Sequence, residues 1–224
     1  MSGWKRLSAV LKGIVYFLLF ADARMVESID KDVLGKIPSF VSTVCDLLKV
    51  AYGIDVDDYY GATLPCDHVC WRTASLEEYR HMKRLFVDYG AKLLAESMIG
   101  GRPISSFKLQ NPIHCGPRKV SVVELPCPKE SRAYDSGFEH CEFVVSSGNN
   151  IGTCKMKALV KFQSNFPSVE FEVNEKDINS DFALQLTEGV SCKFHSNALE
   201  EIIDFEKRHN MLELVPESYF ASRI

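Results

Sequence analysis

The sequence has 224 residues, of which 46% are hydrophobic and 25% charged, a composition typical of a globular protein with a substantial core. Its net charge of −4 at pH 7 argues against a nucleic-acid-binding protein, which normally carries a basic face. No apolar run reaches the roughly 18 residues that a membrane span needs, so we expect no membrane-spanning segment.

The first 25 residues leave two interpretations open. Basic residues precede an apolar run over residues 14–20, and an A-x-A pattern ends at Ala23, which is the outline of a cleaved signal peptide. Met25 follows directly and is an alternative start, which would make residues 1–25 a spurious extension. We expect a cytoplasmic protein, and a secreted one if residues 1–23 are a signal peptide.

The next segment predicts an amphipathic helix. Apolar residues recur at helical spacing from Ile37 to Ala51, and Gly53 stops the run. We expect this N-terminal helix, within residues 30–55, to pack on the domain.

A strand, a helix and three strands follow in that order. The strand is predicted over Asp67–Thr73, and the helix begins with a capping box of Ser75 and Glu78. Apolar stretches separated by turn residues predict the three further strands, at Lys92–Ile99, Ile104–Leu109 and Val120–Leu125.

The same order of elements then returns. A strand at Glu139–Val145 precedes a helix at Cys154–Phe166, and Asn197 with Glu200 caps a last helix. Between these helices we expect strands at Val169–Val173, Phe182–Leu186 and Val190–His195. The sequence therefore predicts an α+β protein with two βαβββ modules, residues 64–127 and 137–196, and a C-terminal helix and tail over residues 197–224.

Polar residues repeat with the modules. His140 follows His68 by 72 residues (68 to 140), and His195 follows Glu124 by 71 (124 to 195), all four on predicted strands. Two such modules side by side would curl into a half-barrel with these side chains on its inner face. Two histidines and a carboxylate suit one divalent ion of Zn, Fe, Mn or Ni. The alternative is that the histidines are buried core residues bonded to glutamates.

Other charged residues on these strands have open roles. Glu142 shares the face of His140 and is a candidate metal ligand, general base or partner that orients His140. Four cations could hold an anionic substrate group or form salt bridges; they are Arg72, Arg102, Lys108 and Lys193. The eight cysteines include no CxxC pair, and we interpret most of them as small buried residues.

Six segments, in order, resemble the YecM family. They are DHVCWR at 67–72, GRPI at 101–104, FKL at 107–109, VELP at 123–126, GFEHCE at 137–142 and KFH at 193–195. The resemblance covers roughly residues 30–205. It implies the vicinal-oxygen-chelate (glyoxalase/bleomycin-resistance/dioxygenase-like) superfamily, whose fold is built from paired βαβββ modules.

The resemblance also implies a ligand pattern. Metal ligands of that superfamily typically come from the first and last strands of each module, which implies His68, Glu124 and His140, with the last place near His195. That last ligand is often Glu, whereas this strand offers Lys193 and His195.

Two classes of function therefore stay open. The first is a metal-dependent enzyme, of isomerase, lyase or dioxygenase-like chemistry, on a small anionic oxygen-bearing molecule, with Glu142 as the base. The second is a non-catalytic small-molecule or metal-binding module that uses the same cleft. The fold cannot choose between them.

Overall fold

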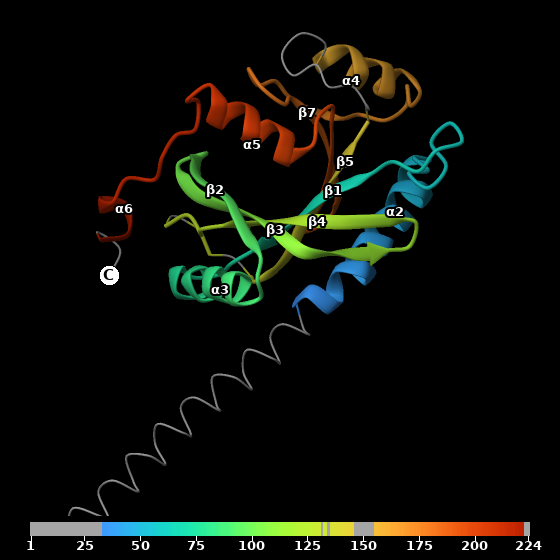
Figure 1. Cartoon of the computed structure of the whole chain (residues 1–224). Coiled ribbons are helices and arrows are strands. Elements are labelled where there is room, and N and C mark those ends of the chain that lie inside the picture. The colour runs from blue at the N-terminus through green and yellow to red at the C-terminus, as the bar shows by residue number, and fades with distance from the viewer. Residues whose placement is uncertain (1–32, 131, 134, 146–154, 222–224) are drawn as a thin grey trace, which may run out of the picture. The chain divides into compact units, whose positions relative to one another are not determined.

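The computed structural model of the chain describes residues 33–130, 132–133, 135–145 and 155–221 (Figure 1). The chain divides into two compact units, Met1–Ile37 and Pro38–Ile224. The first contains the 3₁₀ turn η1 (Leu34–Lys36). Both interpretations of residues 1–25 lie outside the described residues.

The second unit is built on one eight-stranded sheet. Its strands are β1 (Cys66–Arg72), β2 (Lys92–Ile99), β3 (Arg102–Cys115), β4 (Arg118–Pro126), β5 (Gly137–Val144), β6 (Glu172–Asn174), β7 (Asp181–Thr187) and β8 (Val190–His195). Their spatial order is β2-β3-β4-β1-β5-β8-β7-β6, so β1 and β5 form the seam between two equivalent halves. Each half is a βαβββ module, which confirms the α+β class and the predicted pair of modules on one open sheet.

The helices are α2 (Ile37–Tyr52), α3 (Leu76–Asp88), α4 (Lys155–Ser164), α5 (Leu199–Arg208) and α6 (Ser218–Ala221). The α2 helix ends where the sequence predicts, just before Gly53, whose φ of 67° suits glycine. The predicted cap of α3 is also confirmed, because Ser75 Oγ accepts a hydrogen bond from the Glu78 backbone N–H at 3.0 Å.

The outer face of the sheet is apolar. In the first module, Phe86 of α3 stacks on Phe107 of β3, with ring centroids 5.1 Å apart. In the second, Phe162 of α4 lies 4.5 Å from Phe194 of β8. At the seam, Phe40 of α2 stacks on Phe138 at 4.8 Å. Three helices thus cover this face.

The described cysteines are buried in the interior of the domain. All seven in the described residues are buried free thiols, which confirms their interpretation as small core residues. Burial raises the pKa of the Cys45 thiol on α2 to about 12, so the thiolate is disfavoured there. Cys154 lies outside the described residues.

The inner face is covered over the first module by α5. Ile203 of this helix packs with Ala95 and Val122 in a buried cluster, against which Leu199 also packs. None of the helices in the described part of the chain is both long and apolar enough to cross a membrane.

Three local expectations are wrong. The β3 strand continues past the predicted end at Leu109 to Cys115, with an irregular register between Lys108 and Ile113. The β6 strand has only three residues, Glu172–Asn174. The N-cap of α5 is Ala198 instead of Asn197, and it has no side-chain cap hydrogen bond; Asp67, distant in sequence, accepts the hydrogen bond of Leu199 N.

Candidate metal centre

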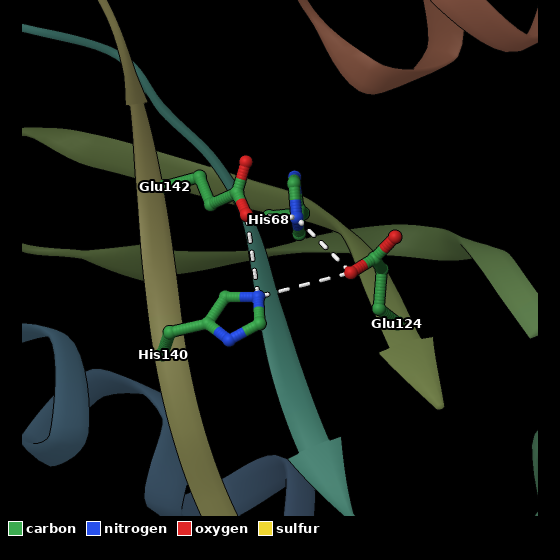
Figure 2. A group of neighbouring side chains, drawn as sticks. All are labelled: His68, Glu124, His140 and Glu142. Atoms are coloured by element: carbon green, nitrogen blue, oxygen red, sulfur yellow. Dashed lines mark ion pairs between the residues drawn. The ribbon is translucent and has the colours of Figure 1, made fainter. Parts of the chain in front are cut away.

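Four side chains of the inner face converge at the seam between the modules (Figure 2). His68 lies on β1, Glu124 on β4, and His140 and Glu142 on β5. In the strand registers, Cys70 of β1 pairs with Glu124 in parallel and with His140 in antiparallel, and His68 pairs with Glu142. Paired residues on adjacent strands point to the same face of a sheet, so these registers bring the four donors together.

Each histidine Nε2 faces both carboxylates. His68 Nε2 lies 3.5 Å from Glu124 Oε2 and 3.5 Å from Glu142 Oε1. His140 Nε2 lies 3.7 Å from Glu124 Oε2 and 3.3 Å from Glu142 Oε1. Two ligands about 2.1 Å from one ion, at tetrahedral angles, are ~3.4 Å apart. The spacing of the four donors therefore fits a shared ion.

The two ring nitrogens have no partner of their own. Both Nε2 atoms are buried and make no hydrogen bond. Leaving a buried polar atom unpaired costs about 1–3 kcal/mol, so a hydrogen-bonded network of histidine and glutamate explains the arrangement poorly. Two imidazoles and two carboxylates form a donor set that suits a divalent first-row metal.

The other nitrogen of His68 is held by its chain neighbour. His68 Nδ1 lies 2.8 Å from Asp67 Oδ2. A carboxylate only accepts hydrogen bonds, so Nδ1 is the donor, and the neutral ring then presents the Nε2 lone pair to the other donors. The sequence patterns did not single out Asp67, because Asn197 with Glu200 already gave a predicted cap for the helix that begins at Leu199.

The charges of the centre support one another. Burial opposes charge on the His68 ring, but Glu142 and Glu124 outweigh it and hold the pKa of His68 well above its usual range. Burial likewise opposes ionisation of both glutamates. His68 nevertheless lowers the pKa of Glu124, and Lys193 with His68 keeps that of Glu142 well below its usual range. Without a metal, the centre therefore contains a protonated His68 between two carboxylates.

Lys193 is part of this centre. It is the register partner of Glu142 on β8, and its Nζ lies 2.8 Å from Glu142 Oε1. Burial opposes its charge, but Glu142 and Glu124 raise the pKa of Lys193 above its usual range. The carboxylate of Glu142 is thus shared between a cation and the two histidines.

His195, predicted as a ligand, lies outside the group of four. It is fully buried, and its Nδ1 donates a hydrogen bond to the backbone carbonyl of Asn197. Its Nε2 lies 3.5 Å from Glu142 Oε2 and 3.7 Å from Asp67 Oδ2. The fourth donor near His68, Glu124 and His140 is therefore Glu142 of β5, and metal binding by His195 remains a prediction.

Arg72, another of the predicted substrate-binding cations, lies beside a pocket. It lines a pocket of about 360 Å³ with Glu139, Gln185 and Ser191. Its Nη1 lies 3.8 Å from Glu139 Oε1. Because Glu139 precedes His140 and Ser191 pairs with it, this pocket borders the metal centre.

The structure does not bring Arg102 and Lys108 to the four donors. Arg102 Nη1 donates to the Cys127 carbonyl at 3.4 Å. Lys108 forms an ion pair with Glu200 in the first turn of α5. Substrate binding by these two residues remains a prediction.

Comparisons with known proteins agree with one another. The sequence model of a family described as "YecM protein" matches residues 30–206. "Protein YecM" of Escherichia coli (strain K12) is 31% identical over 192 residues, which are 81% of this chain and 97% of that protein.

Solved structures include similar folds. "Structural Genomics, Protein EC4020" is 27% identical with a TM-score of 0.59, covering 79% of this chain and 92% of that one. A methylmalonyl-CoA epimerase is 12% identical with a TM-score of 0.42, covering 59% of this chain and 94% of that one.

Proposed function

The chain belongs to the YecM family, and we propose that it is a metal-dependent enzyme acting on a small, anionic, oxygen-bearing substrate at the seam of its two modules. The observation that carries this proposal is the pair of buried, unbonded Nε2 atoms of His68 and His140, each facing the same two carboxylates. His68, Glu124 and His140 are the proposed ligands, with Glu142 completing the set.

A divalent ion bound there would supply Lewis-acid polarisation of substrate oxygens. Charge supports an anionic substrate. The two glutamates carry two negative charges, and Lys193 balances one of them. A divalent ion therefore leaves these groups with one net positive charge, which favours an anion.

Glu142 is the proposed base because it alone among the four donors forms an ion pair with a lysine. A buried carboxylate that leaves a metal normally becomes an unpaired charge. Glu142 remains paired with Lys193 at 2.8 Å, so it can turn to a substrate proton at lower cost. Arg72, in the adjoining pocket, is the cation best placed to orient the substrate.

Isomerase, lyase and dioxygenase-like reactions all fit this arrangement. One observation favours the second candidate, a non-catalytic binding module. Glu142, the proposed base, is held in an ion pair with Lys193, which opposes the uptake of a substrate proton by this carboxylate. Turnover across a panel of hydroxy acids, keto acids and thioesters would separate the enzyme from the binding module.

Metal content tests both candidates. We expect purified protein to bind about one divalent ion per chain, measured by elemental analysis and by calorimetric titration with Zn²⁺ and Mn²⁺. His68→Ala and His140→Ala should lose this ion. His114→Ala, which changes an exposed histidine on β3, is the matched control. A wild-type protein that takes up none of Zn, Fe, Mn or Ni would end the proposal.

The buried free thiols support a reducing, cytoplasmic location. Amino-terminal sequencing of the mature protein tests this, because a start near Arg24 would favour secretion, whereas a start at Met1 or Met25 would not.

A further inference from the structure

One carboxylate oxygen joins the metal centre to the C-terminal helix. Asp67 Oδ2 accepts a hydrogen bond from His68 Nδ1 at 2.8 Å and another from the Leu199 backbone N–H at 2.8 Å. The Asp67 side chain is only 7% exposed, so water competes little for these bonds.

The helix needs this acceptor. The first N–H groups of a helix have no partner within it and are usually bonded by a side chain at the N-cap. The N-cap of α5 is Ala198, which has no such side chain. Asp67, 132 residues away in sequence, serves instead.

The helix is itself fixed to the inner face. Leu199 and Ile203 pack against the buried cluster with Val122, and Glu200 pairs with Lys108 of β3. The position of α5 therefore determines where the Leu199 N–H points, and with it where the Asp67 carboxylate lies.

We infer that Asp67 is a positioning residue through which the docking of α5 sets the orientation of the His68 ring and the metal affinity of the centre. A hydrogen bond to the second nitrogen of a metal-binding imidazole fixes the tautomer and orientation of the ring, and losing such a bond typically weakens metal binding 10–100-fold. Asp67 supplies that bond and is held by the helix. The inference rests on the metal centre proposed above.

Two substitutions of Asp67 test the first link. Asp67→Ala removes the acceptor, and we expect divalent-metal affinity to fall about 10–100-fold in chelator competition. Asp67→Asn keeps an oxygen that can accept both bonds, so it should retain most of the affinity. In NMR spectra of metal-free wild type, the His68 Nδ1 proton should be downfield and slow to exchange. Asp67→Asn should keep this signal and Asp67→Ala should lose it.

A matched pair of variants at Leu199 tests the second link. Leu199→Pro removes the N–H without disturbing the helix, because proline is favoured at the first helical position and Ala198 already has the extended backbone, φ −65° and ψ 143°, that precedes proline. Leu199→Ala loses the same packing but keeps the N–H. We expect Leu199→Pro to bind metal at least about fivefold more weakly than Leu199→Ala.

Glu201→Gln, which changes an exposed residue of the same helix and leaves both Asp67 and the Lys108–Glu200 ion pair untouched, should keep wild-type affinity within twofold. Metal affinity of Asp67→Ala within twofold of wild type, or equal affinities of the two Leu199 variants, would overturn the inference. If wild-type protein binds no metal, the proposed function fails. The His68 Nδ1 proton then decides the positioning role by itself: its loss in Asp67→Ala upholds that role, and its persistence rejects it.

Discussion

The two modules share one topology but contribute differently to the metal centre. The first supplies His68 from its first strand and Glu124 from its last strand, and these two strands pair in parallel. The second supplies both His140 and Glu142 from its first strand, two residues apart, while its last strand presents Lys193. The two modules therefore repeat the same order of strands and helix, but they do not place the same residue types at equivalent positions of the metal centre.

This difference changes the charge of the two halves. No cation other than the histidines is within ion-pair distance of Glu124 in the described residues, whereas Glu142 forms an ion pair with Lys193. The first module therefore supplies two proposed ligands, His68 and Glu124, without a neighbouring lysine. The second supplies His140 together with Glu142, whose carboxylate is also paired with Lys193. Substitutions in the two halves should have different consequences.

The largest effect is expected at Glu124. Its Oε2 faces both histidine nitrogens, at 3.5 and 3.7 Å, so Glu124→Gln replaces a charged donor by a poor neutral one. We expect divalent-metal affinity to fall by more than about 100-fold, beyond the usual effect of a residue outside the ligand set. Calorimetric titration measures this. Glu172→Gln, which changes an exposed glutamate on β6, is the control and should change affinity little. Equal losses in both variants would contradict the assigned ligands.

Lys193→Met should act in the opposite direction. Removing a positive charge 2.8 Å from Glu142 Oε1 leaves that carboxylate free for a cation, so metal affinity should rise about tenfold, or ~1.4 kcal/mol. Lys119→Met, which changes an exposed lysine at the start of β4, is the control and should leave the affinity unchanged. An unchanged or weaker affinity in Lys193→Met would show that the two modules do not differ in this way.

The pH dependence follows from the raised pKa of His68. Its protonated ring cannot bind metal, so binding at neutral pH must release a proton, and affinity should rise with pH by up to about tenfold per unit until pH passes that pKa. Calorimetry in buffers of different ionisation enthalpy counts the proton. His68→Ala should abolish the release. Binding without proton release would contradict the charge state deduced for the metal-free centre.

The same pKa shifts predict how the free energy of unfolding of the metal-free protein depends on pH. Both glutamates have lowered pKa values, so their contribution is present above the usual pKa near 4.5 and is lost as pH falls. Because the pKa of His68 is raised in the folded protein, its contribution to stability is fully present below about pH 6.5. This contribution is lost as the pH rises through the pKa that His68 has in the folded state. Urea midpoints across this range measure the combined effect.

Much of the fold could be predicted because its signals are local. Hydrophobic periodicity gave β2 and β8 with the bounds that the structure has, Lys92–Ile99 and Val190–His195. Strand alternation placed His68 and Glu124 on one face, since a period of two needs no knowledge of the fold. By contrast, the bounds of the short β6 strand depend on its pairing with β7. The residues of that segment alone do not predict this pairing.

The rest of the site depends on contacts between distant segments. Equivalence of the modules favoured the last strand, and therefore His195, over Glu142 as the fourth position. Only the antiparallel register of β1 with β5 brings Glu142 opposite His68. The role of Asp67 is still harder to predict from the sequence. It accepts a hydrogen bond from Leu199 N, so its prediction requires the position of α5, which starts 132 residues later.

The smallest effects are expected on the free energy of unfolding, where the local cap of α3 can be compared with the ion pair between α5 and β3. Ser75→Ala removes the side-chain acceptor of the Glu78 N–H and should lower the free energy of unfolding by about 1 kcal/mol, whereas Ser75→Asp keeps an acceptor and should be nearly neutral. Glu200→Gln breaks a half-exposed ion pair and should cost ~0.5 kcal/mol or less, since it does not cap α5. Urea denaturation measures all three. A larger loss for Glu200→Gln than for Ser75→Ala would mean that Glu200 stabilises the start of α5 after all, and that Asp67 is not its main acceptor.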